Sequence, residues 1–149
     1  MEKKYKLTDE TINLCGKKLC RIKALKDFGD VKKGDKGGFI EDEHNLSHDG
    51  NSWVYDNAKV FDNASVYGNA MVYGNAKIEN NSDYIVFKNW WSSGRYFTWT
   101  RSNNMWKVGC FYGTGEELIK KAYKDSEKSG REYERIVKYV EEIKKENGK

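Results

Sequence analysis

The two histidines of the chain, His44 and His48, lie in an acidic stretch that begins at Glu41. An imidazole can act as a general base or bind a metal ion when a proton or an ion lies within its reach. The carboxylates that could share an ion with these rings are those of Glu41, Asp42, Glu43 and Asp49. Because the spacing of this set matches no zinc or calcium template, we expect a solvated acidic turn. We predict no catalytic residue, no metal site and no cofactor.

A second group of residues that could bind a ligand or partner lies between residues 88 and 107, where tryptophans are interspersed with lysine and arginine. Such rings and cations could stack on nucleobases and contact phosphates, or form a protein-binding face. They could also fill a core beneath helices. Strand alternation places Trp99 on one face and Tyr96 on the other, which is more aromatic surface than one small core needs. We predict a partner-binding face made of Trp90, Trp91, Arg95, Trp99, Arg101 and Lys107.

A six-residue repeat between residues 41 and 82 must position both groups. Its hexads read EDEHNL, SHDGNS, WVYDNA, KVFDNA, SVYGNA, MVYGNA and KIENNS. Asparagine recurs at every sixth position, and from the third hexad the second position is Val or Ile. A fixed short period of this kind indicates a parallel β-solenoid, in which three hexads form one coil. We expect Asn at the corners, where it tolerates a left-handed φ, and Val in the interior.

The aromatic residues that follow the inward Val in each hexad are expected to point outward. Residues eighteen apart should lie side by side in successive coils, so Tyr55 is predicted to stack on Tyr73. Such rings could shield the coil edges or form a face for self-association. The self-association residues that we predict are Trp53, Tyr55, Tyr67, Met71 and Tyr73.

The segments on either side of the hexads have different patterns. Residues 11–25 predict a hairpin that turns at Gly16 and covers the first coil. Residues 83–91, 95–101 and 105–112 predict a three-stranded meander. Two S/T-x-x-E capping boxes, Thr114 with Glu117 and Ser129 with Glu132, predict the starts of two helices. Two coils cannot bury enough surface to be stable alone, so all three segments should form one unit.

Charge and composition narrow the class of protein. The net charge is +4, and an acidic middle separates two basic ends. Residues 1–36 hold 11 Lys/Arg and 6 Asp/Glu, whereas residues 37–83 hold 2 and 8. The sequence has no long apolar run and no apolar segment near residue 1, so we expect neither a membrane span nor a signal peptide. Cys15, Cys20 and Cys110 show no CxxC spacing, which favours reduced thiols in a cytoplasm.

The hexads WVYDNA, SVYGNA and MVYGNA resemble the Val-Tyr-Gly-Asn-Ala repeats of a hexapeptide β-solenoid family of bacterial and bacteriophage proteins, and residues 28–41 resemble the start of such proteins. The resemblance implies a left-handed β-helix and frequent self-association. For the acyltransferases among such proteins it also implies a catalytic histidine and an acyl-carrier pocket between subunits. No insertion interrupts the hexads here, so acyltransferase activity is only a minor alternative. Residues 106–114 and the two helices resemble a module of phage and mobile-element proteins.

Together these patterns predict a mainly β protein with added α structure. Its expected fold is a short left-handed parallel β-helix with an N-terminal hairpin cap and a C-terminal module of three strands and two helices. The expected domains are 1–38, 39–82 and 83–149. The expected function is non-enzymatic binding with homo-oligomerisation in the cytoplasm, which is that of the host cell if the chain is phage-encoded. This function is plausible for a phage accessory protein that occludes a host defence effector, in the manner of anti-CRISPR proteins. Binding of a nucleotide signal or of nucleic acid is the alternative.

Overall fold

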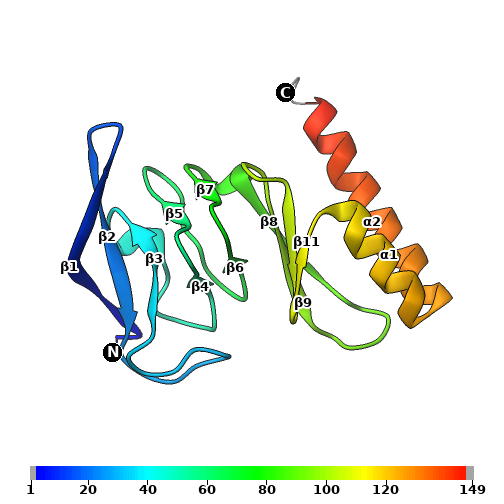
Figure 1. Cartoon of the computed structure of the whole chain (residues 1–149), viewed down its shortest axis with the longest axis horizontal. Coiled ribbons are helices and arrows are strands. Elements are labelled where there is room, and N and C mark those ends of the chain that lie inside the picture. Colours follow the sequence, from blue (N-terminus) through cyan, green and yellow to red (C-terminus); the bar gives the residue numbers. More distant parts are fainter. Residues whose placement is uncertain (1–2, 147–149) are drawn as a thin grey trace.

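The structure, a computed structural model, describes residues 3–146 and is elongated, with a β-hairpin at one end and two helices at the other (Figure 1). The strands of its first half are β1 (Tyr5–Leu14), β2 (Lys17–Ala24), β3 (Lys36–Ile40), β4 (Trp53–Val54), β5 (Lys59–Val60), β6 (Met71–Val72) and β7 (Lys77–Ile78). The second half contains β8 (Tyr84–Lys88), β9 (Tyr96–Thr100), β10 (Met105–Val108), β11 (Phe111–Gly113), α1 (Gly115–Asp125) and α2 (Glu127–Glu146). Short 3-10 turns lie at Glu43–Asn45 and Asn81–Asp83.

The predicted short left-handed parallel β-helix is wrong. The described residues form a mixed α/β fold of several small sheets and two C-terminal helices. The largest sheet, in the order β1-β2-β3-β5-β7, joins an antiparallel hairpin to two-residue parallel strands, and β4 and β6 form a separate parallel pair. A six-residue period determines where the chain turns, but it does not determine which strands pair with the ends of the repeat. The fold implied by the family resemblance fails for the same reason.

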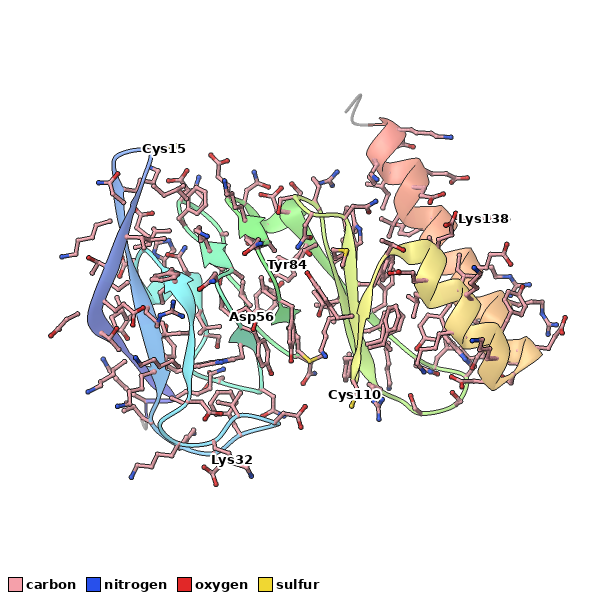
Figure 2. All side chains as sticks on the ribbon, viewed as in Figure 1. Cys15, Lys32, Asp56, Tyr84, Cys110 and Lys138 are labelled. Carbon is pink, nitrogen blue, oxygen red and sulfur yellow. The ribbon has the colours of Figure 1, made fainter. Side chains whose placement is uncertain are left out.

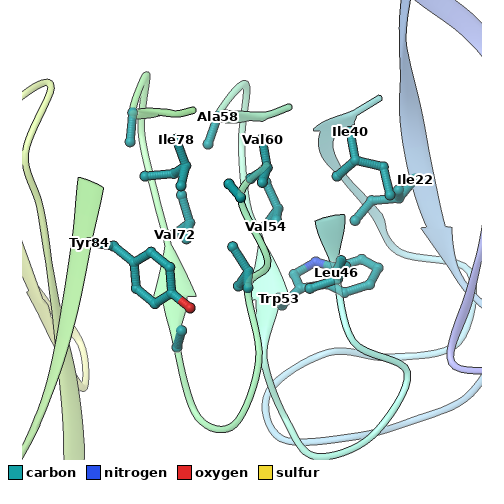
Figure 3. Close-up of a cluster of buried hydrophobic side chains, with 14 of the residues drawn as sticks. Ile22, Ile40, Leu46, Trp53, Val54, Ala58, Val60, Val72, Ile78 and Tyr84 are labelled. Carbon is teal, nitrogen blue, oxygen red and sulfur yellow. The ribbon is translucent and has the colours of Figure 1, made fainter. Parts of the chain in front are cut away.

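Within this fold the local features of the hexads follow the sequence. The inward residues Val54, Val60, Val66, Val72 and Ile78 are all fully buried. The parallel pairs Trp53–Met71 and Lys59–Lys77 join positions eighteen residues apart. The prediction that Tyr55 stacks on Tyr73 is confirmed, with ring centroids 3.9 Å apart. Figure 3 shows the buried row between Ile22 of β2 and Tyr84 of β8.

The residue with a left-handed φ in the hexads is the one before the asparagine, and not the asparagine itself as predicted. Positive φ angles occur at Gly50, Asp56, Asp62, Gly68 and Gly74, which all occupy the fourth position of a hexad. Asparagine at the next position instead accepts or donates hydrogen bonds. Asn45, for example, is fully buried, accepts bonds from the backbone N–H groups of residues 41 and 42, and donates one to the Ala64 carbonyl at 2.8 Å. Glycine or aspartate at the fourth position is therefore the determinant of the turn in these five hexads.

Replacing Gly68 with alanine is expected to lower the free energy of unfolding by about 1–2 kcal/mol, which is the cost of a left-handed L-residue. The space around Gly68 is open and its φ is +68°, so the alanine side chain adds conformational strain without a steric clash. Aspartate, the residue found at positions 56 and 62, should cost less because its short side chain can bond the local backbone. Urea unfolding of both variants measures the difference. Equal stability of wild type and the alanine variant would contradict this account.

The four-stranded antiparallel sheet, in the order β11-β10-β9-β8, is covered on both faces. Trp99 and Trp106 project from one face into the core beneath α1 and α2. The other face lies against the end of the hexads (Figure 1), where side-chain hydroxyls satisfy exposed backbone groups. The Thr98 hydroxyl accepts a bond from the Met71 N–H at 2.9 Å, and the Tyr84 hydroxyl donates to the Ser65 carbonyl at 2.7 Å. Both aromatic faces of this sheet are thus used within the chain.

The predicted elements of the second half are confirmed in part. The capping box at Thr114 and Glu117 begins α1. The second predicted helix begins two residues before Ser129, whose N–H donates to the Ser126 hydroxyl. The predicted third strand, 105–112, is interrupted by a left-handed turn at Gly109 and becomes two strands, so the meander has four.

Candidate functional site

Both histidines have structural partners. His44 Nε2 lies 2.7 Å from the Asp62 carbonyl oxygen, and this hydrogen bond raises the pKa of the imidazole. The ring of His48 stacks on Tyr5, its Nδ1 accepts from the backbone N–H of Lys4, and its Nε2 lies 2.8 Å from Glu43 Oε1. Residues 3–146 contain no group of three or more His, Cys, Asp or Glu side chains arranged to hold a metal ion. His48 therefore connects the N-terminal hairpin to the first hexad, whereas His44 connects the first hexad to the fourth.

Lys4 is a buried cation beside this cluster. Its ammonium donates to the Ser52 carbonyl at 2.7 Å and lies 4.8 Å from the centroid of the Phe28 ring. Burial lowers the pKa of Lys4 from 10.5 to about 8. Between pH 8 and 10.5 the unfolded chain therefore keeps a proton that the folded chain has released. Stability consequently increases with pH across this window.

We expect the unfolding free energy of the wild type to rise by about 1 kcal/mol between pH 7 and pH 9 relative to that of Lys4→Met, because each unit of pKa shift is worth about 1.4 kcal/mol. Urea unfolding of both proteins at the two pH values measures this difference. The methionine variant retains the backbone bond to His48 and cancels titrations common to both chains. Unfolding free energies that change with pH in the same way in the two proteins would refute the lowered pKa of Lys4.

Three of the predicted partner-binding residues lie together where β8 connects to β9. The ring of Trp90 is 65% exposed, and the Lys128 ammonium lies 5.0 Å from its centroid. The Trp91 ring is half-buried and donates from Nε1 to the Ser129 hydroxyl at 3.0 Å. Arg95 is exposed. These three residues surround one region of the surface.

The structure separates the other three predicted partner-binding residues from that region. Trp99 is fully buried, and the Arg101 guanidinium packs 5.3 Å from its ring centroid. Lys107 projects from the opposite face of the sheet, where its ammonium lies 4.3 Å from the Tyr73 ring centroid. These residues hold the sheet to its two neighbours.

The predicted self-association residues are also divided. Trp53 is buried in the core beside Phe28, and Tyr55, Met71 and Tyr73 are half-buried. Tyr67 alone of these five is strongly exposed, at 60%. On one chain these five residues are therefore divided between the core and the surface.

A pocket of about 640 Å³ lies between the four-stranded sheet, the loop 89–95 and the two helices. This volume is within the range of about 300–1,000 Å³ that is typical of small-ligand sites. Its apolar wall consists of Val108, Phe111, Leu118 and Ala122. The Cys110 thiol is exposed at the same pocket, near the foot of the sheet in Figure 2.

The loop 89–95 is ordered by a buried asparagine. Asn89 Oδ1 accepts from the backbone N–H groups of Trp91 and Ser92, at 3.2 and 2.9 Å. The backbone of Asn89 bonds to Arg95 and Gly94, which closes the loop. The Asn89 Nδ2 atom lies 3.5 Å from the hydroxyl of Tyr133 on α2, and burial raises the pKa of this hydroxyl. The backbone of the loop that borders the pocket is therefore fixed by hydrogen bonds within the chain.

The side chains that line the pocket include more positive than negative charges. Arg95 and Lys121 contribute two cations, whereas Asp125 contributes one carboxylate, 3.6 Å from the Lys121 ammonium. The serine hydroxyls of residues 92, 93 and 129 add neutral hydrogen-bonding groups. Such a site can hold an organic molecule through an apolar wall and an anion-binding corner.

Sequence reasoning found Arg95 but missed most of this pocket. Its lining comes from the β8–β9 loop, two strands and two helices, and Asn89 and Tyr133 are 44 residues apart. The sequence pattern assigned residues 89–91 to the predicted strand 83–91 and only residues 92–94 to a turn, whereas β8 ends at Lys88 and the whole segment 89–95 is a loop. A buried asparagine that organises the loop has no distinct signal in one sequence.

No protein-family model matches the chain, and no curated protein matches it. The resemblance to the hexapeptide β-solenoid family is therefore overturned both by the fold and by the absence of a family match. Neither α1 nor α2, the helices of residues 3–146, combines the length and apolar character that crossing a membrane requires.

Proposed function

We propose that this chain is a non-enzymatic binding protein that holds a small organic ligand between its antiparallel sheet and its two helices. The observation that carries the proposal is the pocket of about 640 Å³, with an apolar wall and a few polar groups ordered by Asn89. Ligand sites in proteins typically combine these two features.

The groups that line the pocket support binding without turnover. They include three serines and a cysteine but no histidine. A serine nucleophile requires an adjacent base, and the Ser129 hydroxyl instead accepts from Trp91. The carboxylate of Asp125 is exposed and lies beside Lys121.

The test is a ligand-observed NMR screen of metabolites, including nucleotides, with the full chain. Cys110→Trp places a bulky ring at the pocket, and Cys15→Trp places the same ring on the distant hairpin (Figure 2). We expect ligands that bind the wild type and the Cys15 variant but not the Cys110 variant. Ligands that bind all three proteins equally, the absence of any ligand, or conversion of a ligand to product would overturn the proposal.

A protein partner is the second candidate function, and the exposure of Trp90 beside Lys128 favours it. Exposed tryptophans near cations are frequent binding hot spots. Occlusion of a host defence effector would be one such role. Its test is plaque formation on a host with an active defence system. Protection by the wild type but not by Trp90→Ala is expected, and equal results with both chains would contradict this role.

Self-association is proposed at the free edge of β8. Along an antiparallel strand, the backbone groups of alternate residues bond to the neighbouring strand. At the two ends of β8 the bonds of Asp83 to Arg101 and of Asn89 to Arg95 show that the odd-numbered residues bond to β9. The backbone groups of Val86 therefore face away from β9. Tyr67 and Tyr96 flank a shallow groove along this edge. A second copy could pair antiparallel about Val86 and so extend the sheet.

Light scattering tests this arrangement. We expect the wild type to have twice the chain mass of 17.3 kDa and Val86→Pro to have the chain mass itself. Proline at residue 86 removes an outward N–H without removing a bond to β9. A monomeric wild type, or an equally dimeric proline variant, would exclude pairing at this edge.

A further inference from the structure

We infer that the pocket takes an organic phosphate, whose phosphate group lies at Arg95 and whose remaining part lies on the apolar wall. The inference rests on the proposed function, because it names the class of ligand for the same pocket. It requires a cation that is available to the ligand, neutral donors that complete the phosphate site, and an apolar surface within reach.

Arg95 supplies the available cation. Within residues 3–146 no carboxylate pairs with its guanidinium, whereas Arg21, Arg131 and Arg135 all have carboxylate partners. The guanidinium lies against Gly109, where an added Cβ would be 3.1 Å from the Arg95 Cζ atom. Glycine at this turn therefore leaves room for the guanidinium at the pocket. A guanidinium matches the oxygen atoms of phosphate with two parallel hydrogen bonds.

Two serines supply neutral donors. The Ser93 hydroxyl oxygen accepts from the Arg95 backbone N–H at 3.1 Å, and the Ser129 oxygen accepts from Trp91 Nε1 at 3.0 Å. Each oxygen is used as an acceptor, and among residues 3–146 neither hydroxyl donates a hydrogen bond, so each hydroxyl hydrogen can be donated to a ligand. Phosphate, which carries only acceptor oxygens when ionised, suits this set of donors.

The apolar wall defines the rest of the ligand. Leu118 belongs to the buried core beneath the helices, and the half-buried Phe111 packs against that core. Aromatic and apolar side chains bind the flat face of a ring by stacking and dispersion. The pocket volume of about 640 Å³ can hold a phosphate together with a ring system. A nucleoside monophosphate is a representative probe.

The experiment compares AMP with adenosine by calorimetry on the full chain, with the amide resonances of Val108 and Phe111 reporting where each binds. We expect AMP to bind at least tenfold more tightly than adenosine, since a hydrogen bond to a charged group is worth about that factor. Arg95→Gln should remove the preference, and Arg95→Lys should retain part of it. Lys138→Gln makes the same change of charge on a distant turn of α2 (Figure 2) and should leave the preference intact.

Equal affinities for AMP and adenosine, or an Arg95→Gln variant that binds AMP as the wild type does, would overturn the phosphate assignment while the binding function stands. A 5′-carboxylate analogue of adenosine that binds as tightly as AMP would also overturn it in favour of carboxylates. If AMP, adenosine and the metabolite screen all leave the pocket resonances unchanged, both the assignment and the proposed function fail.

Discussion

Replacing Trp106 with alanine should lower the free energy of unfolding by about 3–5 kcal/mol, the usual cost of removing a buried tryptophan. The Trp106 ring is 1% exposed, and its centroid lies 5.9 Å from that of Phe87 and 6.4 Å from that of Trp99. A cavity at this point would loosen the packing of α1 and α2 on the sheet. Because the same sheet covers the end of the hexads, we expect destabilisation of the whole chain in urea unfolding.

Trp90→Ala is the matched control for this change. Trp90 belongs to the same module but is 65% exposed, so its replacement should alter stability by no more than about 0.5 kcal/mol. Comparable losses in the two variants would show that the tryptophans of this module are not divided into core and surface as described.

Replacing Gly38 with alanine should lower the free energy of unfolding by about 3 kcal/mol, at the upper end of the cost of overpacking. An added Cβ would lie 2.7 Å from Val54 Cγ1 and still closer to the Ala58 carbonyl oxygen. That oxygen accepts from the Phe39 N–H at 2.9 Å, so it cannot move away without weakening the pairing of β3 with β5. The measurement is urea unfolding at neutral pH.

Lys36→Ala serves as the control in the same strand. Lys36 is exposed at the start of β3, and its ammonium lies 3.6 Å from the Glu10 carboxylate. Its replacement should change stability by no more than about 0.5 kcal/mol. An alanine at position 38 that is as well tolerated as one at position 36 would refute the close approach of β3 to the hexads.

The elements were more predictable than their assembly. The hairpin at residues 11–25 corresponds to β1 and β2, and the capping box at Thr114 begins α1 as predicted. The box predicted at Ser129 failed because α2 begins at Glu127 and the Ser126 hydroxyl accepts from the Ser129 N–H, so Ser129 lies inside the first turn. The segment offers two serines three residues apart, and the capping pattern alone does not decide which of them begins the helix.

The sequence pattern identified one residue of the candidate site, Arg95, but it did not indicate that a pocket forms there. An arginine beside tryptophans indicated Arg95, but the same pattern included Trp99, which is buried. Alternation along a strand distinguishes two faces without showing what covers each face. Here the helices cover one face of the sheet and the hexads cover the other.

The sequence by itself determined the turns of the hexads, their buried Val column, the stacking of Tyr55 on Tyr73 and the start of α1. These features depend mainly on φ preferences and side-chain alternation within a few residues. Only the tertiary structure decided that the strands belong to small mixed sheets and that a pocket opens beside Asn89. Both depend on packing between segments far apart in the chain, which no local pattern specifies.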